Sequence, residues 1–241
     1  MIDVHCHLEQ KDYNKDRDRV IEQCAKELKA MITSAARVKD FDLTIELAEK
    51  HKNFVFAVLG LHPADIKELN AKTIDNAIEF ISKNREKIVA VGEVGLDYYW
   101  IKEQQLREKQ KELFRKMINL AKRMNKPLVI HSRDAGNDTL NILKEEDASR
   151  ILLHLFNSRG QINQVIDNGW SISIGPSILK SKDIKKIARD MPLDKVMLET
   201  DSPWFGFGKR NTPLAIKQVA EEIAKIKKIC FGEVWKAAEQ G

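Results

Sequence analysis

The sequence predicts a single α/β domain of the (β/α)8 barrel type, on three observations. Its 241 residues match the size of such a barrel, which is about 250 residues. Short apolar runs alternate with helix-like stretches from one end of the chain to the other, and this alternation is typical of a parallel sheet. Eight such runs can be counted, which favours a closed barrel over an open, doubly wound sheet. We therefore predict one domain that spans residues 1–241.

The eight apolar runs read as buried parallel strands. They are Ile2–Cys6, Ala30–Ser34, Phe54–Leu59, Ile88–Val94, Pro127–Ile130, Ile151–Leu153, Ser171–Ile174 and Val196–Leu198. The clearest helices between and after them are Asp16–Lys29, Asp40–His51, Thr73–Arg85, Lys102–Met124 and Pro213–Lys228. The last helix begins with a proline, where a missing N–H costs nothing. Further helical stretches separate the later strands.

Composition bounds the possible functions. No apolar run approaches the roughly 20 residues of a membrane span, and the N-terminus lacks the basic start and apolar region of a signal peptide. Three widely spaced cysteines, Cys6, Cys24 and Cys230, form no Cys-x-x-Cys pair, which favours a reducing cytoplasm. The net charge of +5 is compatible with a polyanionic ligand, but 41 basic residues face 36 acidic ones, so most charge is paired locally. The chain has no phosphate-binding loop, dinucleotide fingerprint or dedicated nucleic-acid-binding motif.

Potential metal ligands stand at or just past the ends of five of these runs. They are His5, His7, Glu93, His131, His154 and Asp201. Because the carboxyl ends of barrel strands meet at one mouth, we expect these side chains to converge there. His5 and His7 are two residues apart, so both point to the same face of their strand. The pattern predicts a metal site.

Imidazole and carboxylate groups suit Zn, Mn, Fe, Ni or Mg. The set is larger than the three protein ligands and one water that a single hydrolytic metal usually takes, so two ions are the better interpretation. In it Glu93 bridges the ions, His5 and His7 hold one, and His131 and His154 hold the other.

Asp201 completes the first of these sites and orients or deprotonates the attacking water. Taken singly, each residue also has a plainer explanation. A histidine that ends a strand is often structural, and an aspartate before Ser202-Pro203 is commonly a turn or a helix cap. Together the six residues favour the metal site.

Several motifs also carry a resemblance. They are Asp3-x-His5-x-His7, Gly60-Leu-His-Pro63, Gly92-Glu-Val-Gly-Leu-Asp97, His131-Ser-Arg133, His154-x-Phe156, Glu199-Thr-Asp-Ser-Pro-Trp204 and Lys209-Arg-Asn-x-Pro213. In order and spacing this set resembles the TatD family of metal-dependent hydrolases over nearly the whole chain. The resemblance implies an amidohydrolase-type barrel with two divalent ions (Mg, Mn or Zn). It further implies phosphodiester hydrolysis, often as a 3′–5′ exonuclease on DNA, with the same six residues as ligands.

The chain departs from the family pattern in two places. After the sixth strand the family commonly has His-Cys-Phe-Ser-Gly, whereas this chain has His154-Leu-Phe-Asn-Ser158, with Gly160 two residues further on. The C-terminus also lacks the usual Asn-containing, Phe-ended last helix, and Phe231 and Trp235 are expected to substitute for it in packing. We interpret both departures as variation of the fold.

Three residues are candidates for holding a substrate phosphate. Arg133 follows ligand His131 by two positions, and a guanidinium can bind two oxygens at once; an ion pair with Asp134 is the alternative. His62 ends the turn after the third strand and either contacts phosphate or supports a ligand. Arg210 and its two neighbours follow the last strand and can reach the same mouth, although isolated loop cations are usually just solvated.

Aromatic residues cluster in two loops that follow predicted strands. They are Tyr98, Tyr99 and Trp100 after the fourth strand, and Trp204, Phe205 and Phe207 after the eighth. Stacking of a base on such a ring contributes roughly 1–3 kcal/mol. Packing within the loops is the alternative, and Asp97 is expected to orient the first loop.

A deoxyribonuclease that acts on DNA is the leading hypothesis, with no membrane and no obligate protein partner. The alternative is a metal-dependent ester or amide hydrolase, such as a D-aminoacyl-tRNA deacylase. A bridging lysine on the fourth strand would favour it, but Glu93 stands there. A third hypothesis is a non-catalytic, metal-bound barrel, whose expected sign is the loss of Asp201. DNA or RNA, exo or endo action, and the native metal stay open.

Overall fold

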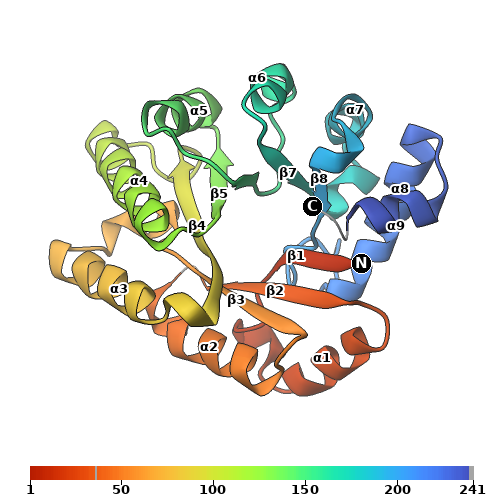
Figure 1. The fold of residues 1–241 in the computed structure, drawn as a ribbon, viewed down its shortest axis with the longest axis horizontal. Helices are drawn as coiled ribbons and strands as arrows, with labels where there is room; N and C mark the ends of the chain where they lie inside the picture. Colours follow the sequence, from red (N-terminus) through yellow and green to blue (C-terminus); the bar gives the residue numbers. More distant parts are fainter. Residues whose placement is uncertain (36, 239–241) are drawn as a thin grey trace. The chain divides into compact units, whose positions relative to one another are not determined.

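The computed structural model describes residues 1–35 and 37–238. Parallel strands alternate with helices along this chain (Figure 1). The strands are β1 (Ile2–Cys6), β2 (Ala30–Ala35), β3 (Val55–Leu59), β4 (Ile88–Asp97), β5 (Leu128–Arg133), β6 (Ile151–Leu153), β7 (Ser171–Ile174) and β8 (Val196–Leu198). They form one eight-stranded sheet in the order β1 to β8, and β1 also contacts β8. This is the topology of a (β/α)8 barrel, so the predicted fold class is confirmed.

The helices follow the strands in the expected places. They are α1 (Arg17–Ala25), α2 (Phe41–Lys50), α3 (Ala71–Lys83), α4 (Gln104–Met124), α5 (Gly136–Glu145), α6 (Ile162–Asp167), α7 (Lys182–Asp190), α8 (Ile216–Lys227) and α9 (Phe231–Ala237). The helix predicted over Pro213–Lys228 is present as α8 and ends within one residue of the predicted position. The prediction that it is the last helix is wrong. The chain turns at Lys228, whose φ of 57° is left-handed, and then forms the additional helix α9.

The chain divides into two compact units. Unit 1 contains Met1–Thr33, Lys50–Phe56 and the chain from His154 onward, and unit 2 contains Ser34–Glu49 and Ala57–Leu153. The single domain predicted from the sequence stays a prediction. No helix in the described ranges is both long and apolar enough to cross a lipid bilayer.

In unit 1 the start of the chain is joined to its end. Parallel pairing of β7 with β8 runs from Ile172↔Val196 to Ile174↔Leu198. Beyond β8, the backbone N–H of Asp201 donates to the carbonyl of His5 (2.9 Å), and that of His7 donates to the carbonyl of Ser202 (2.8 Å). Helices α7, α8 and α9 pack in sequence beside this sheet segment (Figure 1). The residues after β8 are thereby fixed against β1.

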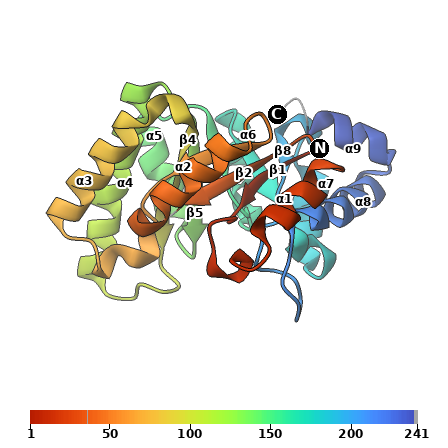
Figure 2. The same ribbon diagram turned by 90° about the horizontal axis from the view of Figure 1, so that it is seen from below.

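In unit 2 the pairing of β4 with β5 is the longest in the described sheet. It continues to Asp97↔Arg133, so β4 extends three residues past the predicted end at Val94. Gly95 makes this possible: its φ is +142°, and a Cβ there would lie 2.0 Å from the His131 carbonyl oxygen. Helices α3 and α4 lie side by side in both views (Figures 1 and 2), and α4 buries Leu113, Phe114, Met117 and Ile118 on one face.

Candidate metal centre

The six predicted ligands lie within or just past the strands, and five of them are buried. His5 belongs to β1, Glu93 to β4 and His131 to β5, whereas His7, His154 and Asp201 lie just past β1, β6 and β8. Only His131 is partly exposed. Because the chain divides into two units, the ligands form two groups that are described in turn.

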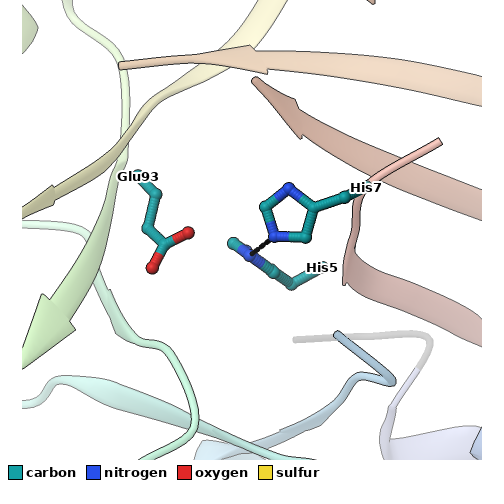
Figure 3. A group of neighbouring side chains, drawn as sticks. All are labelled: His5, His7 and Glu93. Atoms are coloured by element: carbon teal, nitrogen blue, oxygen red, sulfur yellow. Dashed lines mark hydrogen bonds between the residues drawn. The ribbon is translucent and has the colours of Figure 1, made fainter. Parts of the chain in front are cut away.

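In unit 1, three ligand atoms point at one another. Nε2 of His5 lies 3.1 Å from Nε2 of His7, as the dashed line in Figure 3 shows. Oδ1 of Asp201 lies 3.1 Å from the same His7 nitrogen and 3.7 Å from that of His5. Two imidazole nitrogens and one carboxylate oxygen are a donor set that transition metals and zinc accept.

Glu9 fixes the proton of His7. Its Oε1 lies 3.2 Å from Nδ1 of His7, and its Oε2 accepts a hydrogen bond of 2.9 Å from the hydroxyl of Thr33. An acidic partner on Nδ1 places the proton of a neutral imidazole there, so that Nε2 keeps its lone pair for a metal. Glu9 is itself 4% exposed. The sequence reasoning did not identify it.

Glu199 plays the same part for His154. Its Oε2 lies 2.6 Å from Nδ1 of His154, and its Oε1 accepts a hydrogen bond of 2.7 Å from the backbone N–H of Leu155. The imidazole of His154 stacks on that of His5, with ring centroids 3.9 Å apart. Together His5, His154 and Glu199 can bring their ligand atoms within 4.8 Å of one another.

Asp3, the first residue of the Asp-x-His-x-His motif, ties the two ends of unit 1 together. Its Oδ2 accepts from the hydroxyl of Thr200 (2.6 Å), and its Oδ1 accepts from the backbone N–H groups of Thr200 (3.0 Å) and His5 (3.3 Å). Burial raises the pKa of Asp3 well above its usual value, although the bond from Thr200 opposes this. Asp3 is therefore a positioning residue for the strand that carries His5.

In unit 2, His131 stands between two carboxylates. Its Nδ1 lies 2.7 Å from Oε1 of Glu93, and its Nε2 lies 3.0 Å from Oδ2 of Asp97. By the argument used for His7, Asp97 holds the proton on Nε2 and leaves Nδ1 as the ligand atom. Asp97 also accepts from the backbone N–H of Trp100 (2.8 Å), so the predicted orientation of this loop by Asp97 is present in the geometry.

His62 completes this group in a different role. Its Nδ1 accepts a hydrogen bond of 3.1 Å from the backbone N–H of Ala64, which caps the short helix Pro63–Lys67. A neutral imidazole that accepts at Nδ1 carries its proton on Nε2. That nitrogen lies 3.3 Å from Oε1 of Glu93 and 3.2 Å from Nδ1 of His131. His62 is thus a hydrogen-bond donor beside the ligands.

Three of the four predicted histidine ligands therefore have a carboxylate of their own. The pairs are His7–Glu9, His154–Glu199 and His131–Asp97. Carboxylates that orient ligating histidines in this way are usual in metalloenzymes. The signal available in the sequence was short spacing: Glu9 follows a ligand by two residues, Glu199 precedes one by two, and Asp97 follows one by four.

The electrostatics of unit 1 favour a cation. Burial lowers the pKa of His7, but its hydrogen bonds to Asp201 and Glu9 outweigh burial and hold the pKa well above its usual value. In the described part of the chain, no lysine or arginine forms an ion pair with Glu9, Glu199 or Asp201. Buried carboxylates without basic partners are costly unless a cation compensates them. The residues present fit a divalent metal.

The two predicted phosphate-binding arginines have different surroundings. The guanidinium of Arg133 lies 3.8 Å from the ring centroid of Tyr99, and within the described residues it has no carboxylate partner; the alternative pair with Asp134 is not formed. The guanidinium of Arg210 binds both carboxylate oxygens of Asp16, each at 2.7 Å. It helps to line an open surface pocket of about 450 Å³. The sequence could not reveal this pairing.

Comparison with known proteins is consistent with this geometry. The family model of TatD related DNase matches residues 2–240. Human deoxyribonuclease TATDN3 is 35% identical over 252 residues, covering 100% of this chain and 92% of that protein. The chain belongs to the TatD family. It is a metal-dependent hydrolase of the TatD type, as the motifs implied.

Two further similar proteins support the assignment. An uncharacterized metal-dependent hydrolase of Methanocaldococcus jannaschii, MJ1582, is 35% identical over 236 residues, covering 97% of this chain and 91% of that protein. Among solved structures, the TatD homologue YJJV from Escherichia coli K12 superposes with a TM-score of 0.89 at 27% identity, covering 99% of this chain and 95% of that one. The similarity to a solved TatD homologue therefore covers 99% of this chain.

Proposed function

We propose that this protein is a deoxyribonuclease that removes nucleotides from the 3′ end of DNA with the help of two divalent ions. The observation that carries the proposal is the clustering of imidazole and carboxylate ligand atoms, with buried carboxylates that no described lysine or arginine neutralises. Membership of the TatD family and the name of the human relative support DNA as the substrate.

The proposed division of ligands follows the donor atoms. As proposed, His5 and His7 would hold one ion, His131 and His154 would hold the other, and Glu93 would be shared between them. Asp201 would complete the first site. Mg, Mn and Zn all accept such donors. When bound, the ions supply Lewis-acid stabilisation of a phosphoryl oxygen and lower the pKa of water.

The protein's own groups have separate tasks in this proposal. Asp201, whose backbone N–H is held by the carbonyl of His5, would accept the proton of the attacking water at the carboxylate oxygen that the first ion leaves free. The Nε2 N–H of His62 faces Glu93 Oε1 at 3.3 Å in this structure; once Glu93 holds an ion, this N–H would instead donate to a non-bridging oxygen of the substrate. Arg133 binds the same phosphate with a guanidinium that no carboxylate in the described chain occupies. Asp201 is thus the base that activates water, and His62 and Arg133 are the donors that stabilise negative charge on the phosphate.

Three wider predictions accompany the proposal. We place the protein in the cytoplasm, because no cysteine forms a disulfide within the described residues. We infer a single TatD-type domain over residues 1–241, supported by the family match over residues 2–240. We predict no obligate protein partner.

Hydrolysis of another ester or of an amide, as in a D-aminoacyl-tRNA deacylase, is the less favoured candidate. The name of the human relative is that of a deoxyribonuclease, and Glu93 stands where a bridging lysine would have favoured amide chemistry. This candidate serves as the second outcome of the test.

The test uses metal-stripped protein and 5′-end-labelled single-stranded DNA, with Mg, Mn or Zn added back in turn. We expect stepwise shortening that depends on the metal and is lost in Asp201→Asn. Absence of cleavage with every metal, although the protein binds metal stoichiometrically, would refute the nuclease proposal. Release of the amino acid from aminoacyl-tRNA by the same preparations would then support the alternative.

A further inference from the structure

The loop between β4 and α4 exposes two aromatic rings in unit 2. Trp100 is 61% exposed and Tyr99 is 43% exposed. Their ring centroids are 4.9 Å apart, with the planes at 86°. An indole ring in water loses the free energy that burial would provide. Exposed rings of this kind are typical of binding surfaces.

Hydrogen bonds fix this loop on both sides of Trp100. The backbone N–H of Trp100 donates to Asp97, and the ammonium of Lys102 donates to the carbonyl of Tyr98 (3.0 Å). The guanidinium of Arg107 on α4 binds the carbonyl of Ile101 (2.9 Å). The rings are therefore held exposed by a loop that has few ways to fold them inward. A preorganised platform of this kind loses little entropy when it binds a ligand.

The side chain of Arg133, which has no carboxylate partner in the described chain, lies beside both rings. The guanidinium carbon of Arg133 lies 3.8 Å from the centroid of Tyr99 and 5.7 Å from that of Trp100. A guanidinium stacked on a ring keeps its N–H donors in its own plane, where they can bind oxygens. A second cation, the ammonium of Lys102, lies 5.3 Å from the centroid of Tyr99. The cluster thus combines aromatic faces with donors for an anion.

One carboxylate links this cluster to the candidate metal centre. Asp97 binds His131 through Oδ2 and the backbone of Trp100 through Oδ1. Arg133 is two residues after His131 on β5, so both side chains leave the same face of the strand. The position of the exposed rings is therefore fixed relative to the candidate ligand His131.

We propose that Trp100, Tyr99 and Arg133 form a subsite for one unstacked nucleotide next to the scissile phosphodiester. The base stacks on Trp100, Arg133 binds the phosphate, and Tyr99 positions the guanidinium. This inference rests on the proposed nuclease function and adds to it a requirement for a neighbouring base. Stacking explains the exposed ring and is tolerant of base identity, because every base has a flat face.

The test is a double-mutant cycle on the metal-loaded enzyme, in which one change is made in the protein and the other in the DNA substrate. A hexathymidylate is prepared with an abasic residue at each position in turn, and kcat/KM is measured for the wild type and for Trp100→Ala. We expect the wild type to lose about 10-fold at one abasic position. Trp100→Ala is expected to lose about 10-fold on the intact hexamer and less than about twofold more at that position.

Three controls make the result decisive. Trp100→Phe keeps a ring and is expected to keep most of the sensitivity to the abasic position. Phe231→Ala removes another exposed ring, which lies on α9 and in none of the loops that follow the strands, and is expected to behave as the wild type. Thermal melting establishes that each variant is folded. A purely structural defect in Trp100→Ala would lower cleavage of intact and abasic hexamers by the same factor at every position, which would overturn the subsite.

The inference and the function can fail separately. Cleavage of DNA by the wild type without any coupling between Trp100 and an abasic position would overturn the subsite alone. No cleavage of DNA by the wild type would overturn the nuclease proposal, and the nucleotide subsite with it.

Discussion

The histidines of the candidate metal centre differ between the two units in how far solvent reaches them. In unit 1 the side chains of His5, His7 and His154 are at most 5% exposed. In unit 2 those of His62 and His131 are 19% and 15% exposed. The closed group is suited to retaining an ion and to holding a base in a fixed position. The open group is suited to meeting the substrate. Near it in unit 2 are the exposed rings and Arg133, for which the described residues provide no carboxylate partner.

The two groups also differ in how the chain assembles them. The contacts of unit 1 join residues at opposite ends of the sequence: His7 and Asp201 are 194 positions apart, and Asp3 and Thr200 are 197 apart. The contacts of unit 2 join neighbouring strands, since Glu93 and His131 are 38 apart. A variant in unit 1 therefore tests the end-to-end closure of the chain, whereas one in unit 2 tests a local arrangement.

The largest effect is expected from Asp201→Asn. The amide keeps the size of the side chain but cannot accept the proton of a water molecule, so we expect kcat to fall by about 10³-fold, within the range for loss of a general base. The measurement is the initial rate of DNA shortening at saturating metal. Asp194→Asn, an exposed aspartate before β8, is the matched control and should keep full activity. A loss of less than about 10-fold in Asp201→Asn would remove this residue from the role of base.

The next largest effects are expected from variants of the carboxylates that orient the ligand histidines, Glu199 in unit 1 and Asp97 in unit 2. In Glu199→Gln the amide group can still accept from Leu155, but its NH2 then faces Nδ1 of His154. This forces the proton of the imidazole onto Nε2, the proposed ligand atom. We expect metal affinity to fall by about 10- to 100-fold, measured by titration calorimetry against a competing chelator.

Asp97→Asn makes the equivalent change for His131 in unit 2. We expect a similar loss of metal affinity of about 10- to 100-fold. Because Asp97 also holds the backbone of Trp100, this variant should in addition raise KM for DNA, which Glu199→Gln should not do. Equal KM values in the two variants would contradict the link between His131 and the aromatic loop.

Much of this arrangement could be predicted from the sequence, because it depends on local pattern. Apolar runs gave the strands within a few residues, and their positions relative to the runs, together with the family motifs, pointed to six candidate ligands, which stay a prediction. The extension of β4 to Asp97 was missed because it requires Gly95 to lie almost against the His131 carbonyl, a contact that no local pattern encodes. Helix α9 was missed because it has only seven residues, of which Val234 alone is buried, so its apolar pattern is too short to indicate a helix.

The partners of the ligands could not be predicted in the same way. Glu9 and Glu199 are close to ligands in the sequence, but spacing alone does not say whether a carboxylate faces an imidazole or the solvent. Arg210 illustrates the opposite case: its partner Asp16 lies 194 positions away, so the sequence offered no reason to expect the pair. Whether a residue is free or engaged is decided by long-range contacts.

The smallest effects, on KM for DNA, are expected when Arg133 and Arg210 are replaced. Arg133 has no carboxylate partner in the described chain, so its charge is fully available to a phosphate, and we expect Arg133→Gln to raise KM for DNA by about 10-fold. The charge of Arg210 is largely offset by Asp16, and the pair is exposed, so Arg210→Gln should raise KM by about threefold or less. KM at low and moderate salt is the measurement, because screening weakens an exposed charge more. A larger effect from Arg210→Gln than from Arg133→Gln would mean that the substrate displaces Asp16, and the phosphate contact would then belong to unit 1.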